Sequence, residues 1–251
     1  MIKIAVKKIV AAMGYEIRQA VKIDYRFVPR QEDKFKWLQA LNIRTILDIG
    51  ANTGQFASEF RSILPEAKIY SFEPLRECFD ALAKNMEHVP QFQAFPFALG
   101  DEETEIQMNR NELSPSSSIL AMADLHKKTY PFTANAFAER ITVKRLDDVA
   151  SHIDLSPNIL IKMDVQGFED RVILGGMNTI PKAKLVIVET SFERLYEGQP
   201  SFDKIYDLMK RMGFAYHGNF GQLLSPKDGN ILQADAMFLK AGPNAKPTRG
   251  R

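Results

Sequence analysis

The stretch Thr45-Ile-Leu-Asp-Ile-Gly-Ala-Asn-Thr-Gly54 decides the fold, because an apolar, β-branched run ends in an acid and enters a loop of small residues. A second apolar run, Ile69-Tyr-Ser-Phe-Glu-Pro74, also ends in an acid. The pattern predicts a strand, a loop, a helix and a second strand, with Asp48 and Glu73 at the carboxyl ends of the two strands. Ligands bind outside the carboxyl ends of strands in open α/β sheets, so we expect a ligand site there.

The two acids favour a ligand with a cationic group at one end and a hydroxylated sugar at the other. A dinucleotide loop uses three glycines to approach a pyrophosphate, whereas this loop has Gly50 and Gly54 with Asn52 between them. Asp48 would repel a pyrophosphate and attract an ammonium, while Glu73 can pair with ribose hydroxyls in either ligand class. S-Adenosylmethionine fits both acids. The alternative is an ordinary strand-to-helix turn with glycines at positive φ and a solvated acidic cap.

The composition is that of a globular protein without a bias towards polyanionic partners. The chain has 251 residues, of which 45% are hydrophobic and 25% are charged, and its net charge is +2. This length favours one α/β domain with a small extension, and this charge gives no reason to expect a nucleic-acid partner. The single cysteine, Cys78, excludes an internal disulfide and is interpreted as a buried structural thiol. The four histidines are scattered without metal-ligand spacing, so no metal site is expected.

The two ends of the chain differ from its middle. Residues 1–33 are expected to form an amphipathic helix, with an apolar stripe from Ile2 to Ile17 beside basic residues, and an irregular connection. Packing on its own domain or on a second subunit, contact with a membrane surface and coverage of a substrate pocket all remain open for this helix. Residues 241–251 are rich in Pro, Gly, Lys and Arg and are expected to be disordered. Without a long apolar run or a signal-peptide pattern, the chain is expected to be cytoplasmic.

Residues 34–240 are expected to form the main domain, in which strands and helices alternate. The predicted strands span about 44–49, 67–73, 92–99, 105–109, 141–146, 159–164, 184–189, 214–217 and 234–239. The predicted helices span about 35–41, 55–64, 75–86 and 202–212, and a further helix begins near Gly167. Short links between alternating elements predict an α/β fold with a mostly parallel sheet and helices on both faces.

Several segments in a fixed order resemble FkbM-type S-adenosylmethionine-dependent methyltransferases over about residues 44–240. They are Leu47-Asp-Ile-Gly-Ala-Asn-Thr-Gly-Gln-Phe56, Phe72-Glu-Pro74, Ala98-Leu-Gly-Asp101, Ser116-Ser-Ser118, Arg145-Leu-Asp-Asp148, Ile161-Lys-Met-Asp-Val-Gln-Gly-Phe-Glu169 and Val186-Ile-Val-Glu189. The resemblance implies a seven-stranded, Rossmann-like class I methyltransferase sheet whose last strand is antiparallel. It also implies O-methylation of a hydroxyl on a sugar, a glycan or a secondary metabolite. Gln166 departs from the family, which often carries an acid there, and this argues against a catalytic role for that position.

Each end of the expected cofactor is assigned to a part of the predicted site. The residues expected to bind the cofactor are Asp48, Gly50, Asn52, Gly54, Glu73, Leu99 and Asp101. Asp48 is assigned to the ammonium and Glu73 to the ribose. The backbone N–H groups of the loop are expected to face the carboxylate of the cofactor. Leu99 and Asp101, at the end of the third strand, are the candidates for contact with the adenine face and its amino group.

A hydroxyl acceptor must lose a proton, which favours a positioned base. Asp164, after the fourth main strand, is the leading candidate, with a helix N-cap or a cofactor contact as its alternative. Lys162 shares its sheet face and is either an ion-pair partner or a base with a lowered pKa. Glu189 is expected to orient the substrate or bind a histidine. His217 is a further candidate base, and residues 116–118 are candidates for the pocket wall.

Two hypotheses from other functional classes compete with methyl transfer. The same strand-helix-strand unit could serve a nicotinamide-dependent oxidoreductase, or the fold could be a scaffold without catalytic activity that binds a partner. A ligand that binds the native state raises thermal stability. S-Adenosylhomocysteine should therefore stabilise a methyltransferase, whereas NAD should not.

Overall fold

The computed structural model describes residues 35–111, 118–120, 136–193, 195–225 and 228–242. The chain divides into two compact units, Met1–Trp37 and Leu38–Arg251, and nearly all described residues belong to the second. The helix expected within residues 1–33 and most of the tail expected at 241–251 lie outside the described residues. The predicted domain boundaries therefore stay predictions.

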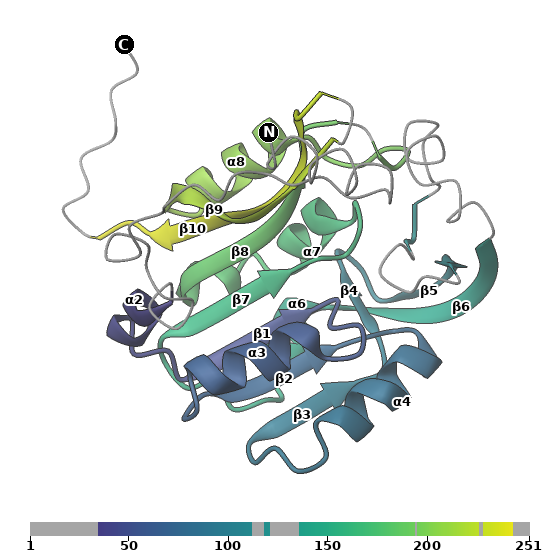
Figure 1. The fold of residues 1–251 in the computed structure, drawn as a ribbon. Coiled ribbons are helices and arrows are strands. Elements are labelled where there is room, and N and C mark those ends of the chain that lie inside the picture. The colour runs from purple at the N-terminus through teal and green to yellow at the C-terminus, as the bar shows by residue number, and fades with distance from the viewer. Residues whose placement is uncertain (1–34, 112–117, 121–135, 194, 226–227, 243–251) are drawn as a thin grey trace, which may run out of the picture. The chain divides into compact units, whose positions relative to one another are not determined.

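Within the described residues, seven strands form the main sheet in the order β3-β2-β1-β7-β8-β10-β9 (Figure 1). The strands are β1 (Thr45–Ile49), β2 (Lys68–Phe72), β3 (Phe92–Phe95), β7 (Ile159–Met163), β8 (Ala183–Ser191), β9 (Phe214–Leu224) and β10 (Ile231–Lys240). The first five strands of that order pair in parallel. β10, the last strand in the chain, runs antiparallel to β8 and β9. The predicted α/β class and the antiparallel last strand are confirmed.

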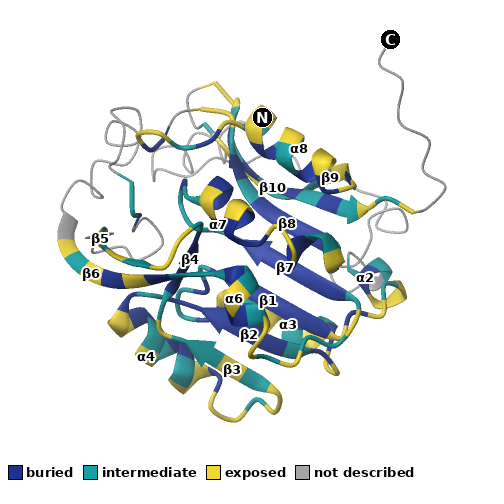
Figure 2. Ribbon diagram, turned by 180° about the vertical axis from the view of Figure 1, so that it is seen from behind, coloured by how far each residue is buried: buried dark blue, intermediate teal, exposed yellow. Residues whose placement is uncertain are grey.

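Helices cover both faces of this sheet, as expected for parallel strands with crossover helices. They are α3 (Gln55–Ile63), α4 (Arg76–Asn85), α6 (Leu146–Ala150), α7 (Glu169–Gly175) and α8 (Phe202–Arg211). Two short helices, α2 (Lys36–Ala40) and the 3₁₀ helix η4 (Ile180–Lys182), precede β1 and β8 in the chain. α3 lies over one face in Figure 1, and α6 lies over the opposite face in Figure 2. α8 shows why a helix forms at such a position in the sequence. Ser201 caps it by accepting a hydrogen bond from the Lys204 N–H, and Ile205 and Met209 are buried on one side.

A second sheet of three strands, ordered β4-β6-β5, forms among the described residues. It consists of β4 (Ala98–Gly100), β5 (Thr104–Asn111) and β6 (Ala136–Arg145). The prediction of one continuous strand over 92–99 is wrong. β3 ends at Phe95, because Pro96 has no N–H to donate to the ladder. Leu99 therefore lies in β4 of the second sheet, and Asp101 directly follows that strand, so neither residue stands at the end of the third main strand.

The two faces of the central strands differ in chemistry. β1 and β7 are buried at every position (Figure 2). One face contributes apolar side chains to the core beneath α6, α7 and α8, including Leu47, Ile49, Ile161 and Met163. On the other face, buried Asp48 lies beside buried Lys162 in register. Buried charges are costly unless paired, so this polar patch within a covered sheet marks a functional position.

Within the described ranges, no helix combines the length and the apolar character needed to cross a membrane.

Candidate active site

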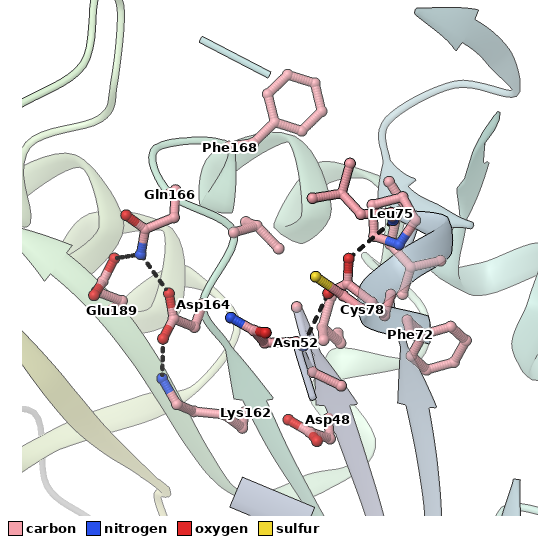
Figure 3. Close-up of a pocket in the computed structure, with 18 of the residues that line it drawn as sticks. Asp48, Asn52, Phe72, Leu75, Cys78, Lys162, Asp164, Gln166, Phe168 and Glu189 are labelled. Atoms are coloured by element: carbon pink, nitrogen blue, oxygen red, sulfur yellow. Dashed lines mark hydrogen bonds and ion pairs between the residues drawn. The ribbon is translucent and has the colours of Figure 1, made fainter. Parts of the chain in front are cut away.

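A cavity of about 550 Å³ lies at the carboxyl ends of β1, β2, β7 and β8, within the usual size range of small-molecule sites. Of the predicted site residues, those that line it are Asp48, Gly50, Asn52, Glu73, Leu99, Lys162, Asp164 and Glu189. Figure 3 shows Lys162, Asp164 and Glu189 on one side of this cavity and Leu75 and Cys78 on the other. The cavity thus has a charged wall and an apolar wall.

The loop after β1 bends tightly because its residues adopt left-handed backbone conformations. Gly50 has a φ of 82°, Asn52 of 50° and Gly54 of 94°, and Gly54 is the N-cap of α3. A side chain at position 50 would overlap the backbone oxygen of Asp164. Gly50 therefore allows the loop to pass against the end of β7. Positive φ at both glycines is a feature of the alternative interpretation, an ordinary strand-to-helix turn. Gly54 shapes the loop without lining the cavity.

Glu73 connects this loop to the end of β2. Its Oε2 accepts a hydrogen bond from the Asn52 N–H at 2.8 Å, and its Oε1 accepts one from the Leu75 N–H at 2.9 Å. Burial raises the pKa of Glu73 to about 7, although these two backbone donors act in the opposite direction. A carboxylate offers about four lone-pair positions, so two remain for a ligand in the cavity.

Asp48 lies deeper, at 1% exposure. It stands in register between Ser71 of β2 and Lys162 of β7, and its Oδ2 accepts a hydrogen bond from Ser71 Oγ at 3.1 Å. Burial raises the pKa of Asp48 to about 7, more than the Ser71 hydrogen bond and the Lys162 charge lower it. A ligand cation near this carboxylate would favour its ionised form.

Lys162 forms an ion-pair cluster on the charged wall. Its Nζ donates to Asp235 Oδ1 at 2.8 Å and to Asp164 Oδ2 at 3.4 Å. Burial lowers the pKa of Lys162, but the carboxylates of Asp164, Asp235 and Glu189 outweigh it and the net pKa is raised. A protonated lysine is a poor base, so the geometry favours the ion-pair interpretation over the alternative of a base.

Gln166 joins the two acids of this wall (Figure 3). Its Nε2 donates to Asp164 Oδ1 and to Glu189 Oε2, each at 2.7 Å. Its Oε1 accepts a hydrogen bond from Tyr196 Oη at 2.7 Å. The partner of Glu189 is thus a glutamine and not the histidine that was one expectation.

Glu169 holds the turn between β7 and α7. Its Oε1 accepts hydrogen bonds from the Val165 and Gly167 N–H groups, each at 3.1 Å. The side chain is buried, and burial raises its pKa to about 7. α7 begins at Glu169 with Phe168 as its N-cap, so Asp164 is not the helix N-cap that was its alternative.

The remaining predicted residues lie outside the cavity wall or at its edge. Asp101 accepts a hydrogen bond from Arg171 Nη1 at 2.7 Å and does not line the cavity. His217 is an exposed residue of β9 that also does not line it. Ser118 Oγ donates to the backbone oxygen of Gln166 at 2.6 Å, whereas residues 116 and 117 are outside the described residues. Cys78 is buried, as expected, and lines the apolar wall.

Sequence reasoning missed the residues that hold the side chains of the charged wall in place. Asp235 left a weak signal, an acid among apolar residues in the last strand, and its pairing with Lys162 required the sheet order. Gln166 was noticed only as a departure from the family. The sequence gives no signal for Tyr196, because this residue reaches Gln166 from a loop 30 positions further along the chain.

The strand order, the antiparallel last strand and the acids at the ends of β1 and β2 are those of a class I methyltransferase. The family model described as the methyltransferase FkbM domain matches residues 48–216, and the chain belongs to this methyltransferase family.

Several curated relatives have methyltransferase names, two of which also describe the reaction or the substrate. The 2-O-methyltransferase NoeI of Sinorhizobium fredii is 33% identical over 171 residues, which cover 65% of this chain and 70% of NoeI. The hexuronic acid methyltransferase AglP of Haloferax volcanii is 25% identical over 144 residues. These residues cover 57% of this chain and 54% of AglP.

Among solved structures, the methyltransferase FkbM of Methylobacillus flagellatus aligns with a TM-score of 0.48 and 14% identity. The alignment covers 86% of this chain and 49% of that one.

Proposed function

We propose that this methyltransferase transfers a methyl group from S-adenosylmethionine to a hydroxyl of a sugar or of a secondary metabolite. The observation that supports it most is the position of Asp48 and Glu73, two acids at neighbouring strand ends that line one cavity. The names of NoeI, a 2-O-methyltransferase, and AglP, a hexuronic acid methyltransferase, support a sugar hydroxyl as the acceptor.

The donor set of the cavity fits the proposed cofactor. Asp48 supplies a buried negative charge for the ammonium, and Glu73 retains lone pairs for the two ribose hydroxyls. Leu75 and Leu99 offer apolar surface for the adenine. Asp101 lies outside this wall, so the support for an adenine contact comes from Leu99 and not from Asp101. When bound, the cofactor supplies an electrophilic methyl group on a sulfonium.

The protein's own part in the reaction is to orient the acceptor and to receive a proton. Holding the acceptor oxygen in line with the methyl group lowers the barrier by removing the entropy cost of encounter. Asp164 and Glu189 both line the cavity, so either carboxylate could act as the base. Lys162 keeps this wall from carrying uncompensated negative charge.

A screen with a ¹³C-methyl-labelled donor tests the proposal. The purified protein is incubated with a panel of neutral glycosides, uronic acids and hydroxylated secondary metabolites, and the labelled product is located by NMR. We expect label on oxygen, release of S-adenosylhomocysteine and thermal stabilisation by S-adenosylhomocysteine but not by NAD. Label on nitrogen, or stabilisation by NAD alone, would contradict the proposal.

A further inference from the structure

The orientation of the Gln166 side-chain amide follows from its partners. Tyr196 Oη donates a hydrogen bond when its partner is an acceptor, so the 2.7 Å contact fits the carbonyl oxygen of the amide. The amide nitrogen then faces two carboxyl oxygens, one from Asp164 and one from Glu189, and can donate to both. The backbone of Gln166 is also held, because Ser118 Oγ donates to its carbonyl oxygen. Gln166 therefore fixes the two acids as one unit.

The two acids of this unit differ in what they can offer a ligand. Asp164 uses one oxygen for Gln166 and directs the other towards the Lys162 ammonium. Glu189 uses Oε2 for Gln166, and its Oε1 has no hydrogen-bond partner among the described residues. Since Glu189 lines the cavity, that oxygen is available to an acceptor hydroxyl.

We propose that Glu189 is the catalytic residue that takes the proton of the acceptor hydroxyl, that Gln166 is its positioning residue, and that Asp164 serves as the ion-pair partner of Lys162. This inference rests on the proposed function and assigns separate roles within the same site. The acceptor oxygen bonds to the methyl carbon, and the carbon–sulfur bond breaks with its electron pair remaining on sulfur. The hydroxyl proton moves to Glu189 Oε1.

The electrostatic environment agrees with this division. Burial raises the pKa of Glu189 well above its ordinary value, and the Asp164 carboxylate adds to the effect while Lys162 opposes it. The charged and titratable groups that face Glu189 are Lys162 and Asp164 of β7 and its following turn, Glu169 of α7, Asp235 of β10 and Tyr196. A base works best when its pKa lies near the working pH, and a carboxylate with a raised pKa meets this condition better than an ordinary one.

The first test compares Glu189→Gln with Asp235→Asn, using the acceptor that the screen identifies. Each change removes one carboxylate from the cluster, but Asp235 is not in the cavity wall. We expect Glu189→Gln to lower kcat at least 100-fold and to abolish the acidic limb of the pH–rate profile. Asp235→Asn should keep the limb and move it to lower pH, because a neighbouring negative charge has been removed.

The second test addresses Gln166. Gln166→Met keeps the bulk of the side chain and removes its donors, so the acidic limb of kcat should move to higher pH. Tyr196→Phe should move it in the same direction and by less. Gln233 also lines the cavity, and its side chain makes no hydrogen bond to other described residues. It provides the matched Gln233→Met control, in which the limb should stay in place.

Binding of S-adenosylhomocysteine to every variant separates this inference from the proposed function. If wild type transfers no label to oxygen, the proposed function fails. If wild type is active, every variant binds the ligand, and Glu189→Gln keeps the wild-type kcat and acidic limb, only the assignment to Glu189 fails. A wild-type pH profile in Gln166→Met would overturn the positioning role.

Discussion

The backbone N–H of Asn52 lies 2.8 Å from Glu73 Oε2, so the loop after β1 is fastened to the acid at the end of β2. One carboxylate thus shapes the loop and faces the cavity. Hydrogen bonds to a charged group contribute about 1.5–3 kcal/mol each. A ligand that bonds to Glu73 therefore also depends on a loop that Glu73 holds in place.

Glu73→Ala should reduce the affinity for S-adenosylhomocysteine at least 100-fold, because it removes the proposed ribose acceptor and loosens the loop. Isothermal titration calorimetry measures the effect. Glu66→Ala, at an exposed position before β2, is the matched control and should bind as wild type does. If Glu73→Ala binds S-adenosylhomocysteine as tightly as wild type, the ribose does not bind at Glu73.

Ligand affinity should depend on pH through Asp48. Burial raises the pKa of Asp48 to about 7 in the ligand-free protein, while a ligand ammonium interacts favourably with the ionised form. The affinity should therefore be full above pH 7 and fall up to tenfold for each pH unit below it. Titrations with S-adenosylhomocysteine between pH 5.5 and 7.5 measure this slope. Asp48→Asn should bind more weakly and with a flatter pH dependence; a wild-type slope in that variant would contradict the assignment.

Glu169→Gln should raise stability at neutral and higher pH. The pKa of Glu169 is raised from 4.5 to about 7 by burial, so its contribution to stability is present below pH 4.5 and is lost as the pH rises through about 7. The bonds from the Val165 and Gly167 N–H groups reach the same oxygen, and a glutamine oxygen can accept both without ionising. The gain over wild type should approach about 3 kcal/mol at pH 8 and vanish near pH 4.5.

Urea unfolding of the ligand-free protein at the two pH values measures this difference. Glu103→Gln, at an exposed position, is the control and should show no comparable pH-dependent gain. A Glu169→Gln protein that is less stable than wild type at pH 8 would show that the second oxygen of Glu169 matters more than its ionisation.

Gly50→Ala should damage both the fold and ligand binding. The new methyl group would overlap the Asp164 backbone oxygen, and φ would remain in the left-handed region, so a cost of at least about 3 kcal/mol is expected. Gly229→Ala has a similar φ of 75° but open space around the position, and it should cost only about 1 kcal/mol. Thermal unfolding with and without S-adenosylhomocysteine compares the two. Equal losses would mean that φ alone, and not contact with β7, requires glycine at position 50.

The sequence was sufficient for the order of strands and helices and for the acids at strand ends. Asp48 and Glu73 could be placed because a parallel strand brings its carboxyl end to one known edge. The sequence pattern did not show that Pro96 and Phe97 separate β3 from β4. Because of this break, Asp101 lies away from the cavity and contacts Arg171.

The partners of the charged wall could not be predicted in the same way. The bond between Lys162 and Asp235 joins residues 73 positions apart and depends on β10 inserting between β8 and β9. Gln166 could be named from sequence, but its role depends on Tyr196 reaching its side chain from a separate loop. Such contacts come from tertiary packing and leave no periodic trace in the chain.

A crystal structure with S-adenosylhomocysteine bound tests the central claim most directly. The account predicts the ribose hydroxyls at Glu73, the ammonium on the Asp48 side and the thioether sulfur facing the wall formed by Asp164 and Glu189. A ligand found elsewhere on the protein, or bound here with its ribose away from Glu73, would contradict it.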